Sequence, residues 1–313
     1  ETFPGHVNNL YLLIQGDHRI LWDVGSGFDS STRDLERGVH IVRDVFSEDI
    51  GFDRIQSAII SHGHLDHYGG AGWIRQNTHA EILIHELDRR VVAHFEERLT
   101  VATRDVRRFY LDSGVPAAEL SEFMDLYTST KNLYRSTVVD HGLVDGERIG
   151  PGFEVIHVPG HCSGLICLRI DDILLTADHI LARITPHQSP EVITPYTGLG
   201  HYFESLVRIR RLDGIRLGLP AHQEPIHDVN ARIGEIRKHH DRRLGQVQGI
   251  CREAHTMYGV ACALYGERKG YDRLLAVLEA GAHVEYLFHR GALRAANPVA
   301  VATSDDAISF QTR

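Results

Sequence analysis

Three histidines and an aspartate crowd into one short segment, Ser61-His62-Gly63-His64-Leu65-Asp66-His67. His62 and His64 alternate, so from an extended segment both can point the same way. Asp66 and His67 follow a turn of the chain and can face a neighbouring position. Imidazole and carboxylate groups are common ligands of Zn²⁺, and a catalytic ion keeps one coordination position open for water. The segment therefore supplies half of two adjacent metal sites.

Three later segments place further ligand types at the ends of strand-like runs. They read VPGHC (158–162), LTADH (175–179) and LPAH (219–222). The candidate ligands in them are His161, Asp178 and His222. Histidine makes up 22 of the 313 residues, roughly three times an ordinary share, and several histidines stand beside Asp or Gly. This composition also indicates metal binding.

Short apolar runs bounded by turn residues predict the strands that must position these side chains. The runs are NNLYLLIQ (8–15), RILWDVGSG (19–27), SAIISHGH (57–64), EILIH (81–85), FEVIHV (153–158), LICLRI (165–170) and DILLTA (172–177). A helix is predicted from about Thr32 to Phe46. The polar residues of interest lie just past strand ends, where loops on a rigid sheet commonly carry chemistry.

Two regions have helical periodicity with almost no strand signal. The first, from about 87 to 135, reads as a helical insertion between strands, and the second runs from Ile226 to about Gly291. We therefore expect a catalytic domain over residues 1–228 and a C-terminal helical domain over residues 229–295 that docks on it. Residues 296–313 are small and polar, and we expect a mobile or partner-docked tail.

Composition narrows the possible functions. The chain carries 33 Lys+Arg against 42 Asp+Glu, a formal charge of -9, which disfavours phosphate backbones and anionic lipid. No stretch approaches 18 consecutive apolar residues, and the first residues lack a signal-peptide pattern. The four cysteines are too few and too irregularly spaced for a disulfide scaffold. We expect reduced thiols, a cytoplasmic location, and neither a membrane nor a nucleic-acid partner.

Together with LWDVGSG (21–27), the motifs SHGHLDH, PGHCSG, TADH and PAH resemble those of the metallo-β-lactamase fold superfamily over about residues 5–228. The resemblance implies an α/β fold, a four-layer αββα sandwich. It also implies that Asp23 braces the metal site. The sequence departs from the superfamily's pattern at Ala177 and Ala221, which stand where glycine is usual. The implied ligand sets are His62, His64 and His161 for one metal ion, Asp66, His67 and His222 for the other, and Asp178 as the bridge.

This ligand set implies a dinuclear metal-dependent hydrolase with two divalent ions, zinc in the first place and iron or manganese as alternatives. The implied nucleophile is a hydroxide that bridges the metals, so no Ser or Cys nucleophile is required. Asp178 would take part as the bridging ligand. Asp66, a ligand with a spare oxygen, is the candidate to accept or return a proton.

The flanking segments DHILARITPH (178–187) and HYFESLVRIRRL (201–212) resemble the hydroxyacylglutathione hydrolase and thioesterase branch. The C-terminal region resembles a winged-helix-like domain found on some relatives. These features favour a small-molecule acyl thioester of the acyl-CoA, acyl-carrier or glutathione type, and a homodimer is plausible. The alternatives are a lactone hydrolase, an endoribonuclease, a mono-iron sulfur dioxygenase and a regulatory protein without turnover.

Further residues complete the expected site. His179, His187 and Tyr196 are candidates for its second layer or its substrate pocket. The remaining histidines, among them His6, His240 and His283, receive no metal role. RKHHDRR (237–243) is the one local cluster of positive charge, and it reads either as a solvated or interdomain helix face or as a phosphate contact.

Overall fold

The computed structural model describes residues 1–3, 5–129 and 131–313. Contacts between Cα atoms divide them into two compact units. The first unit comprises residues 1–98, 134–186 and 205–232. The second comprises residues 99–133, 187–204 and 233–313. Each unit is built from segments that alternate along the chain. The units therefore do not test the sequence-based boundaries at 228 and 295, which remain a prediction.

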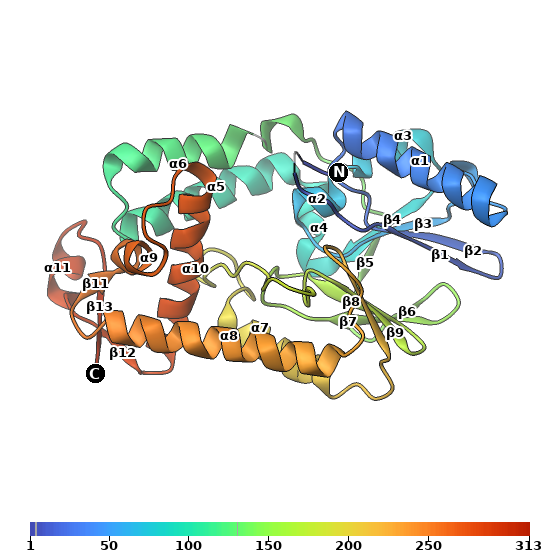
Figure 1. The fold of residues 1–313 in the computed structure, drawn as a ribbon. Helices are drawn as coiled ribbons and strands as arrows, with labels where there is room; N and C mark the ends of the chain where they lie inside the picture. The colour runs from blue at the N-terminus through green and yellow to red at the C-terminus, as the bar shows by residue number, and fades with distance from the viewer. Residues whose placement is uncertain (4, 130) are drawn as a thin grey trace. The chain divides into compact units, whose positions relative to one another are not determined.

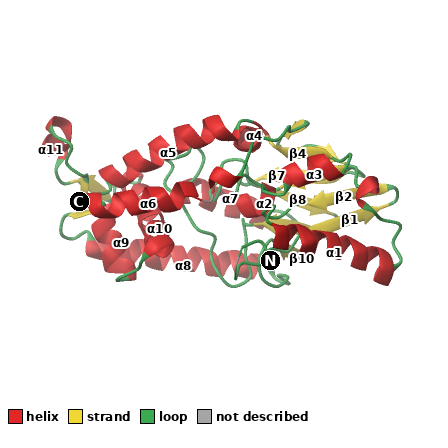
Figure 2. Cartoon of the chain, turned by 90° about the horizontal axis from the view of Figure 1, so that it is seen from above, coloured by secondary structure: helices red, strands yellow, loops and turns green. Residues whose placement is uncertain are grey.

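The first unit contains a five-stranded sheet that begins as a hairpin and continues with parallel strands (Figure 1). In spatial order the strands are β1 (Tyr11–Gln15), β2 (His18–Trp22), β3 (Ser57–Ile60), β4 (Glu81–His85) and β5 (His141–Leu143). Strands β2 to β5 are parallel to one another. Helices α1 (Asp29–Phe46) and α3 (Ala71–Asn77) lie beside this sheet in both views (Figures 1 and 2).

A second five-stranded sheet in the same unit is mostly antiparallel. Its strands in spatial order are β10 (Leu217–Pro220), β9 (Ile173–Ala177), β8 (Ile166–Ile170), β7 (Phe153–His157) and β6 (Arg148–Ile149). Strand β10 is parallel to β9, whereas β9, β8 and β7 are successively antiparallel. Strands β7, β9 and β10 therefore run in the same direction.

Both sheets bury apolar side chains, which holds the strands rigidly. Trp22, Ile59 and Ile60 of the first sheet are fully buried, as are Val155 and Leu168 of the second. The backbone NH of Ile166 donates to the Ser61 carbonyl at 3.0 Å, so the two sheets meet beside the histidine-rich segment. The fold is the αββα sandwich expected from the sequence.

Short helices connect the strands of the first unit. They are η1 (Phe52–Arg54), α2 (Leu65–Tyr68) and α4 (Glu86–Ala93). Helix α2 is a single turn that starts directly after His64. It carries Asp66 and His67, as the sequence pattern required.

The second unit is mainly helical. Its helices are α5 (Phe95–Asp112) from residue 99, α6 (Ala117–Ser129), η2 (Lys131–Leu133), α7 (Leu199–Arg210) to residue 204, α8 (Val229–Ile250) from residue 233, α9 (Met257–Tyr265), α10 (Gly270–His289) and α11 (Pro298–Thr303). Gly114 and Pro116 lie between α5 and α6. No helix of the described residues has the length and apolar character needed to cross a membrane.

The C-terminal segment differs from the mobile or partner-docked tail expected for residues 296–313. Residues Ser309–Thr312 form β13, the central strand between β11 (His255–Thr256) and β12 (Leu293–Ala295). Phe310 is buried in this small sheet. Two to four residues per strand are too few to produce an alternating pattern in the sequence, which explains the difference.

Candidate metal centre

Strand direction brings the first candidate residues together. Trp22, the last residue of β2, is the register partner of Ile59 in the parallel strand β3. Because the carboxyl ends of parallel strands meet at one edge of a sheet, Asp23 emerges beside Ser61 and His62. The next residues of the chain turn into α2, which carries Asp66 and His67.

The second sheet supplies the remaining candidates from three strands that end at the same edge. His161 follows β7, Asp178 follows β9, and His222 follows β10. Ala177 and Pro220 are register partners across the parallel pair β9 and β10. This pairing fixes the separation between Asp178 and His222. Sheet topology thus explains why ligand types so far apart in the sequence lie close together.

His62, His64 and His161 form one group of three imidazoles whose potential ligand atoms lie within 4.8 Å of one another. The Nε2 atom of His62 is 2.9 Å from Nδ1 of His64. The ring centroids of His64 and His161 are 4.6 Å apart. His62 and His161 are buried, whereas His64 is exposed. Solvent therefore reaches the group from the side of His64.

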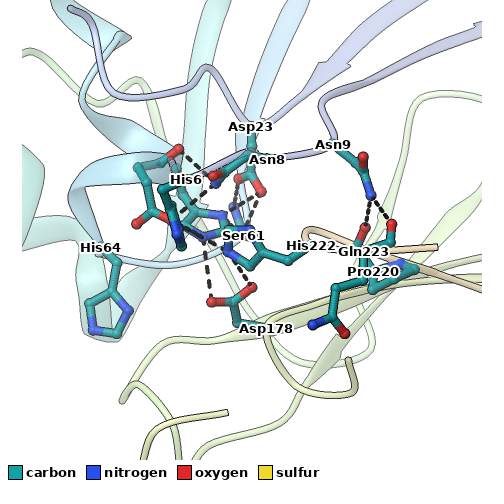
Figure 3. Close-up of polar contacts among 12 residues, drawn as sticks. His6, Asn8, Asn9, Asp23, Ser61, His64, Asp178, Pro220, His222 and Gln223 are labelled. Carbon is teal, nitrogen blue, oxygen red and sulfur yellow. Dashed lines mark hydrogen bonds and ion pairs between the residues drawn. The ribbon is translucent and has the colours of Figure 1, made fainter. Parts of the chain in front are cut away.

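The other predicted ligands form an adjacent group around two carboxylates. His67 Nε2 lies 3.3 Å from Asp66 Oδ2 and 3.6 Å from Asp178 Oδ2. His222 Nε2 lies 3.5 Å from Asp66 Oδ2 and 3.3 Å from Asp178 Oδ1 (Figure 3). Asp178 Oδ2 is also 3.6 Å from His161 Nε2. Asp178 thus stands between the two groups. We refer to the seven side chains together as the strand-edge centre.

Hydrogen bonds from behind orient the imidazoles of this centre. Asp23 Oδ2 lies 2.8 Å from His67 Nδ1, and Asp23 also accepts hydrogen bonds from the backbone NH and hydroxyl of Ser61. His222 Nδ1 donates to the carbonyl of Val7 at 2.8 Å. Each contact places a proton on Nδ1, so Nε2 is the nitrogen that faces the centre and could bind a metal ion, the arrangement seen around metal-bound histidines.

His6 and Asn8 also belong to this neighbourhood, although the sequence analysis gave them no role. His6 Nε2 lies 3.2 Å from Asp66 Oδ2, and the Asn8 side chain donates to the same oxygen at 3.1 Å (Figure 3). His6, Asp66 and His222 form a further group with ligand atoms within 4.8 Å. Both residues precede the first strand instead of following one, so no strand-end signal marked them.

The electrostatics of the centre are dominated by burial and by mutual attraction. Burial, reinforced by repulsion from His67 and His64, lowers the pKa of His62 well below its ordinary value. Burial alone would raise the pKa of Asp178, but attraction by His67 and a hydrogen bond from His222 outweigh it and lower that pKa. Burial also opposes charge on His222, yet hydrogen bonds to Asp178 and Asp66 raise its pKa to about 10. The carboxylates therefore stay ionised and need cationic partners.

In the metal-free protein these contacts pair imidazoles with carboxylates, and their lengths also suit two ligands that share a metal ion. Two ligands of a tetrahedral ion, each about 2.1 Å from it, stand about 3.4 Å apart. The contacts of His67 and His222 with Asp66 and Asp178, at 3.3–3.6 Å, match this separation. Hydrogen bonds of nitrogen to oxygen are usually 2.7–3.2 Å long. The donor set of imidazoles and carboxylates suits a pair of divalent ions such as zinc.

A buried carboxylate that the sequence analysis missed ties two ligand loops together. Asp88 Oδ2 accepts from the backbone NH of Gly63 at 2.8 Å, and Oδ1 accepts from that of Gly164 at 2.9 Å. A Cβ at Gly164 would lie 2.6 Å from the Asp88 carboxyl carbon, so glycine is required there. Asp88 follows a helix start within a charged run, and nothing in its local sequence marks it.

Cys162 is held as a neutral thiol by the same carboxylate. Its Sγ donates to Asp88 Oδ2 at 3.1 Å. Burial and the negative charge of Asp88 raise the pKa of Cys162 well above its ordinary value. A thiol in this state is a poor nucleophile, in line with the expectation that the site uses no cysteine nucleophile.

The three remaining predicted residues have different surroundings. His179 is fully buried in the first unit, and burial, with a smaller repulsion from His161, lowers its pKa to about 3. His187 belongs to the second unit, where its Nδ1 lies 3.3 Å from Glu279 Oε2. Tyr196, also in the second unit, is 47% exposed, and its ring centroid is 5.8 Å from that of His201. A pocket role for these residues remains a prediction.

Known structures resemble this chain over nearly its whole length. A metallo-beta-lactamase family protein of Thermus thermophilus is 25% identical and superposes with a TM-score of 0.77 over 98% of this chain and 94% of that one. A beta-lactamase domain protein of Burkholderia ambifaria is 22% identical, with a TM-score of 0.78 over 98% of this chain and 88% of that one. The second likeness shows the fold alone.

Sequence comparisons agree with the structural ones. Lactamase-like protein aptB of Emericella nidulans is 26% identical over 272 residues, which are 83% of this chain and 68% of the relative. An atrochrysone carboxyl ACP thioesterase of Aspergillus chevalieri is 25% identical over 248 residues, 79% of this chain and 61% of the relative. The sequence model of the metallo-beta-lactamase superfamily matches residues 4–222, which span the whole strand-edge centre. The chain belongs to that superfamily.

Proposed function

We propose that this chain hydrolyses an acyl thioester with the help of two divalent metal ions, zinc in the first place, held by the strand-edge centre. The observation that carries the proposal is the convergence of seven ligand-type side chains with separations suited to metal ligation. Members of this superfamily are usually hydrolases and typically bind divalent metals, which supports the same conclusion.

The bound ions would lower the pKa of a water molecule toward neutrality and would polarise the carbonyl oxygen of the substrate. In the reaction the water oxygen bonds to the acyl carbon, the carbon–sulfur bond breaks, and a carboxylic acid and a thiol result. The thiolate leaving group must regain a proton. We assign this transfer to Asp66, and the support is that its side chain is 15% exposed and that His6 and Asn8 both contact its Oδ2 atom.

Several residues hold the reacting groups in place without moving protons. Asp23 fixes the ring of His67, and the Val7 carbonyl fixes that of His222. Asp178 stands between both groups and would hold a metal ion in each. Such preorganisation contributes to catalysis because the site need not rearrange as charge develops.

A thioester is favoured over RNA as the substrate on two grounds. The net charge of -9 would repel a phosphate backbone. In addition, the relative from Aspergillus chevalieri carries the name of an acyl-carrier-protein thioesterase. The match has 25% identity and covers 61% of that relative. The identity of the acyl group therefore does not carry over from that relative to this chain. The proposal is therefore limited to the thioester class.

The test is a substrate panel assayed with purified, zinc-loaded protein. It compares an acyl-CoA, an acyl-carrier-protein thioester and an acyl-glutathione with a lactone and a single-stranded RNA. We expect thiol release from at least one thioester at a rate well above lactone opening and RNA cleavage. Turnover of the lactone or of RNA with all thioesters inert would overturn the proposed substrate class.

Variants link the activity to the strand-edge centre. His161→Ala should abolish thiol release and lower the metal content. Cys162→Ala is the matched control at the adjacent position, and it should retain activity because the neutral thiol takes no part in the reaction. Iron as the only bound metal, with oxygen consumption in place of hydrolysis, would favour a dioxygenase and contradict the proposal.

A further inference from the structure

A second cluster of ligand-type side chains lies in the helical unit. His240 of α8 contacts His283 of α10, and Glu279 stands one turn before His283 on the same helix. The potential ligand atoms of the three residues lie within 4.8 Å of one another. We call these residues the helical cluster. From the sequence, no metal role was expected for His240 or His283.

The geometry of the helical cluster repeats that of the strand-edge centre. His240 Nδ1 is 3.1 Å from His283 Nε2, close to the 2.9 Å between ring nitrogens of His62 and His64. A contact of this length is a hydrogen bond in the metal-free protein, and the two nitrogens need to separate by only a few tenths of an ångström to stand about 3.4 Å apart, as two ligands of one tetrahedral ion do. Glu279 and His283 are four residues apart, so both project from one face of α10.

Hydrogen bonds hold the cluster in an orientation that suits ligation. His283 Nδ1 donates to the backbone carbonyl of Glu279 at 2.7 Å, so its Nε2 presents a lone pair to His240. Glu279 Oε2 accepts from the backbone NH of Gln188 at 2.6 Å and lies 3.3 Å from His187 Nδ1. These contacts anchor the carboxylate through Oε2, while Oε1 lies 3.8 Å from His283 Nδ1, the ring nitrogen that also bonds the Glu279 carbonyl.

The surroundings of the cluster are closed and aromatic. His240 and His283 are fully buried, and the Glu279 side chain is 16% exposed. The rings of Tyr202 and Phe203 lie 5.7 and 5.8 Å from that of His240. Such a shell excludes substrate but favours a tightly held ion.

We propose that His240, Glu279 and His283 bind one divalent transition-metal ion, zinc or a similar ion, that joins α8 to α10. This site is separate from the strand-edge centre and serves structure instead of turnover. One carboxylate and two imidazoles form a donor set that zinc accepts. The ion would also compensate the charge of a carboxylate that is otherwise largely buried.

The test counts bound zinc in the full-length chain. Metal-depleted protein is incubated with Zn²⁺, freed of excess metal by gel filtration, and analysed for zinc. His283→Gln should bind one equivalent less than the native chain while retaining hydrolase activity. This difference does not depend on how many ions the strand-edge centre holds. His289→Gln, an exposed histidine on the same helix, is the control and should match the native stoichiometry.

A second measurement applies if the variant does not fold. Crystals of the native protein are soaked in Zn²⁺, and anomalous scattering is recorded at the zinc absorption edge. A peak between His240 Nδ1 and His283 Nε2 supports the proposal. Peaks confined to the strand-edge centre, or equal zinc content in the native chain and His283→Gln, would overturn it.

Discussion

The strand-edge centre and the helical cluster use the same types of side chain in different frameworks. In the strand-edge centre, the candidate ligands follow the ends of parallel strands and stand on loops with unusual backbone. Asp23, Ala177 and Gln223 there have φ angles of 60°, 45° and 73°. The helical cluster relies instead on two regular helices, and none of its residues has a positive φ among those described.

The two sites differ in solvent access, and solvent access determines whether a bound metal ion can take part in catalysis. His64 is exposed and opens the strand-edge centre to solvent. His240 and His283 are fully buried and closed off by aromatic rings. A catalytic ion needs an open position, whereas a structural ion is surrounded. We therefore expect loss of the first centre to remove activity, and loss of the second to remove only metal.

The largest effect should come from Asp178→Asn. This change removes the charge that stands between His161, His67 and His222. We expect the rate of thioester hydrolysis to fall by at least about a thousand-fold, because both groups lose a shared anionic partner. Zinc at the helical cluster should remain. Steady-state kinetics and metal analysis of the same preparation measure both quantities.

Asp172→Asn provides the control for this prediction. Asp172 is an exposed carboxylate in the same unit that pairs with Arg216. It should leave kcat and zinc content at native values. If Asp178→Asn lost the zinc of both centres together, the separation between them would be refuted.

A smaller effect is expected for Asp23→Asn. Asp23 orients His67 through a 2.8 Å contact with Nδ1 and also binds Ser61. Loss of such a supporting carboxylate typically weakens metal binding by about 10- to 100-fold. Asparagine tolerates the positive φ at this position, so the backbone should be preserved. Competition with a fluorescent zinc chelator measures the change.

The control here is Asp140→Asn. Asp140 accepts from the backbone NH of Ile82 and pairs with Arg75, away from the ligand loops. It should lower stability without changing zinc affinity. An unchanged zinc affinity in Asp23→Asn would mean that the Asp23 carboxylate is not needed to orient His67 for metal binding.

Much of the strand-edge centre could be predicted from the sequence. Alternation in SHGHLDH places His62 and His64 on one side, and strand-like runs ending in His161 and Asp178 anticipate the second sheet. Those signals are local, because each ligand directly follows an apolar run. The order of motifs along the chain then identified the fold.

The residues that escaped prediction lack a local signal. His240 and His283 are 43 positions apart, and on amphipathic helices a histidine looks like any other polar residue near a core. His6 precedes a strand instead of following one. Asp88 and Phe310 act through contacts distant in sequence, with Gly63 and within the small C-terminal sheet. Such roles follow from packing, which periodicity does not encode.

A histidine outside both clusters tests whether burial away from a candidate metal site also lowers the pKa of a histidine at a strand end. The ring of His85 stacks on His157 at 4.0 Å, and its Nδ1 accepts from the Leu87 NH at the start of α4. Burial, with repulsion from His157, lowers the pKa of His85 to about 4. Between pH 6.5 and 4 the unfolded chain binds a proton that the folded chain refuses, so stability falls as pH falls.

His85→Asn should reduce this pH dependence. Asparagine can cap α4 in the same way and does not titrate. We expect the free energy of unfolding of metal-free protein to fall by about 1–2 kcal/mol less in the variant than in the native chain as pH drops from about 7 to about 5. Urea unfolding with a chelator present measures it. Identical losses in both proteins would assign the acid sensitivity to other groups.

The smallest effect concerns backbone strain beside the strand-edge ligands. Ala177 and Ala221 are both buried and each precedes a predicted ligand, but only Ala177 has a positive φ. Replacing either by glycine loses one buried methyl group and adds chain entropy to the unfolded state, and these costs are similar at both positions. Relief of the left-handed conformation offsets them at Ala177 alone. Ala177→Gly should therefore be about 1 kcal/mol more stable than Ala221→Gly in urea unfolding of metal-free protein. Equal stabilities would show that the loop after β9 carries no strain, which would remove one of the contrasts between the strand-edge centre and the regular helices of the other cluster.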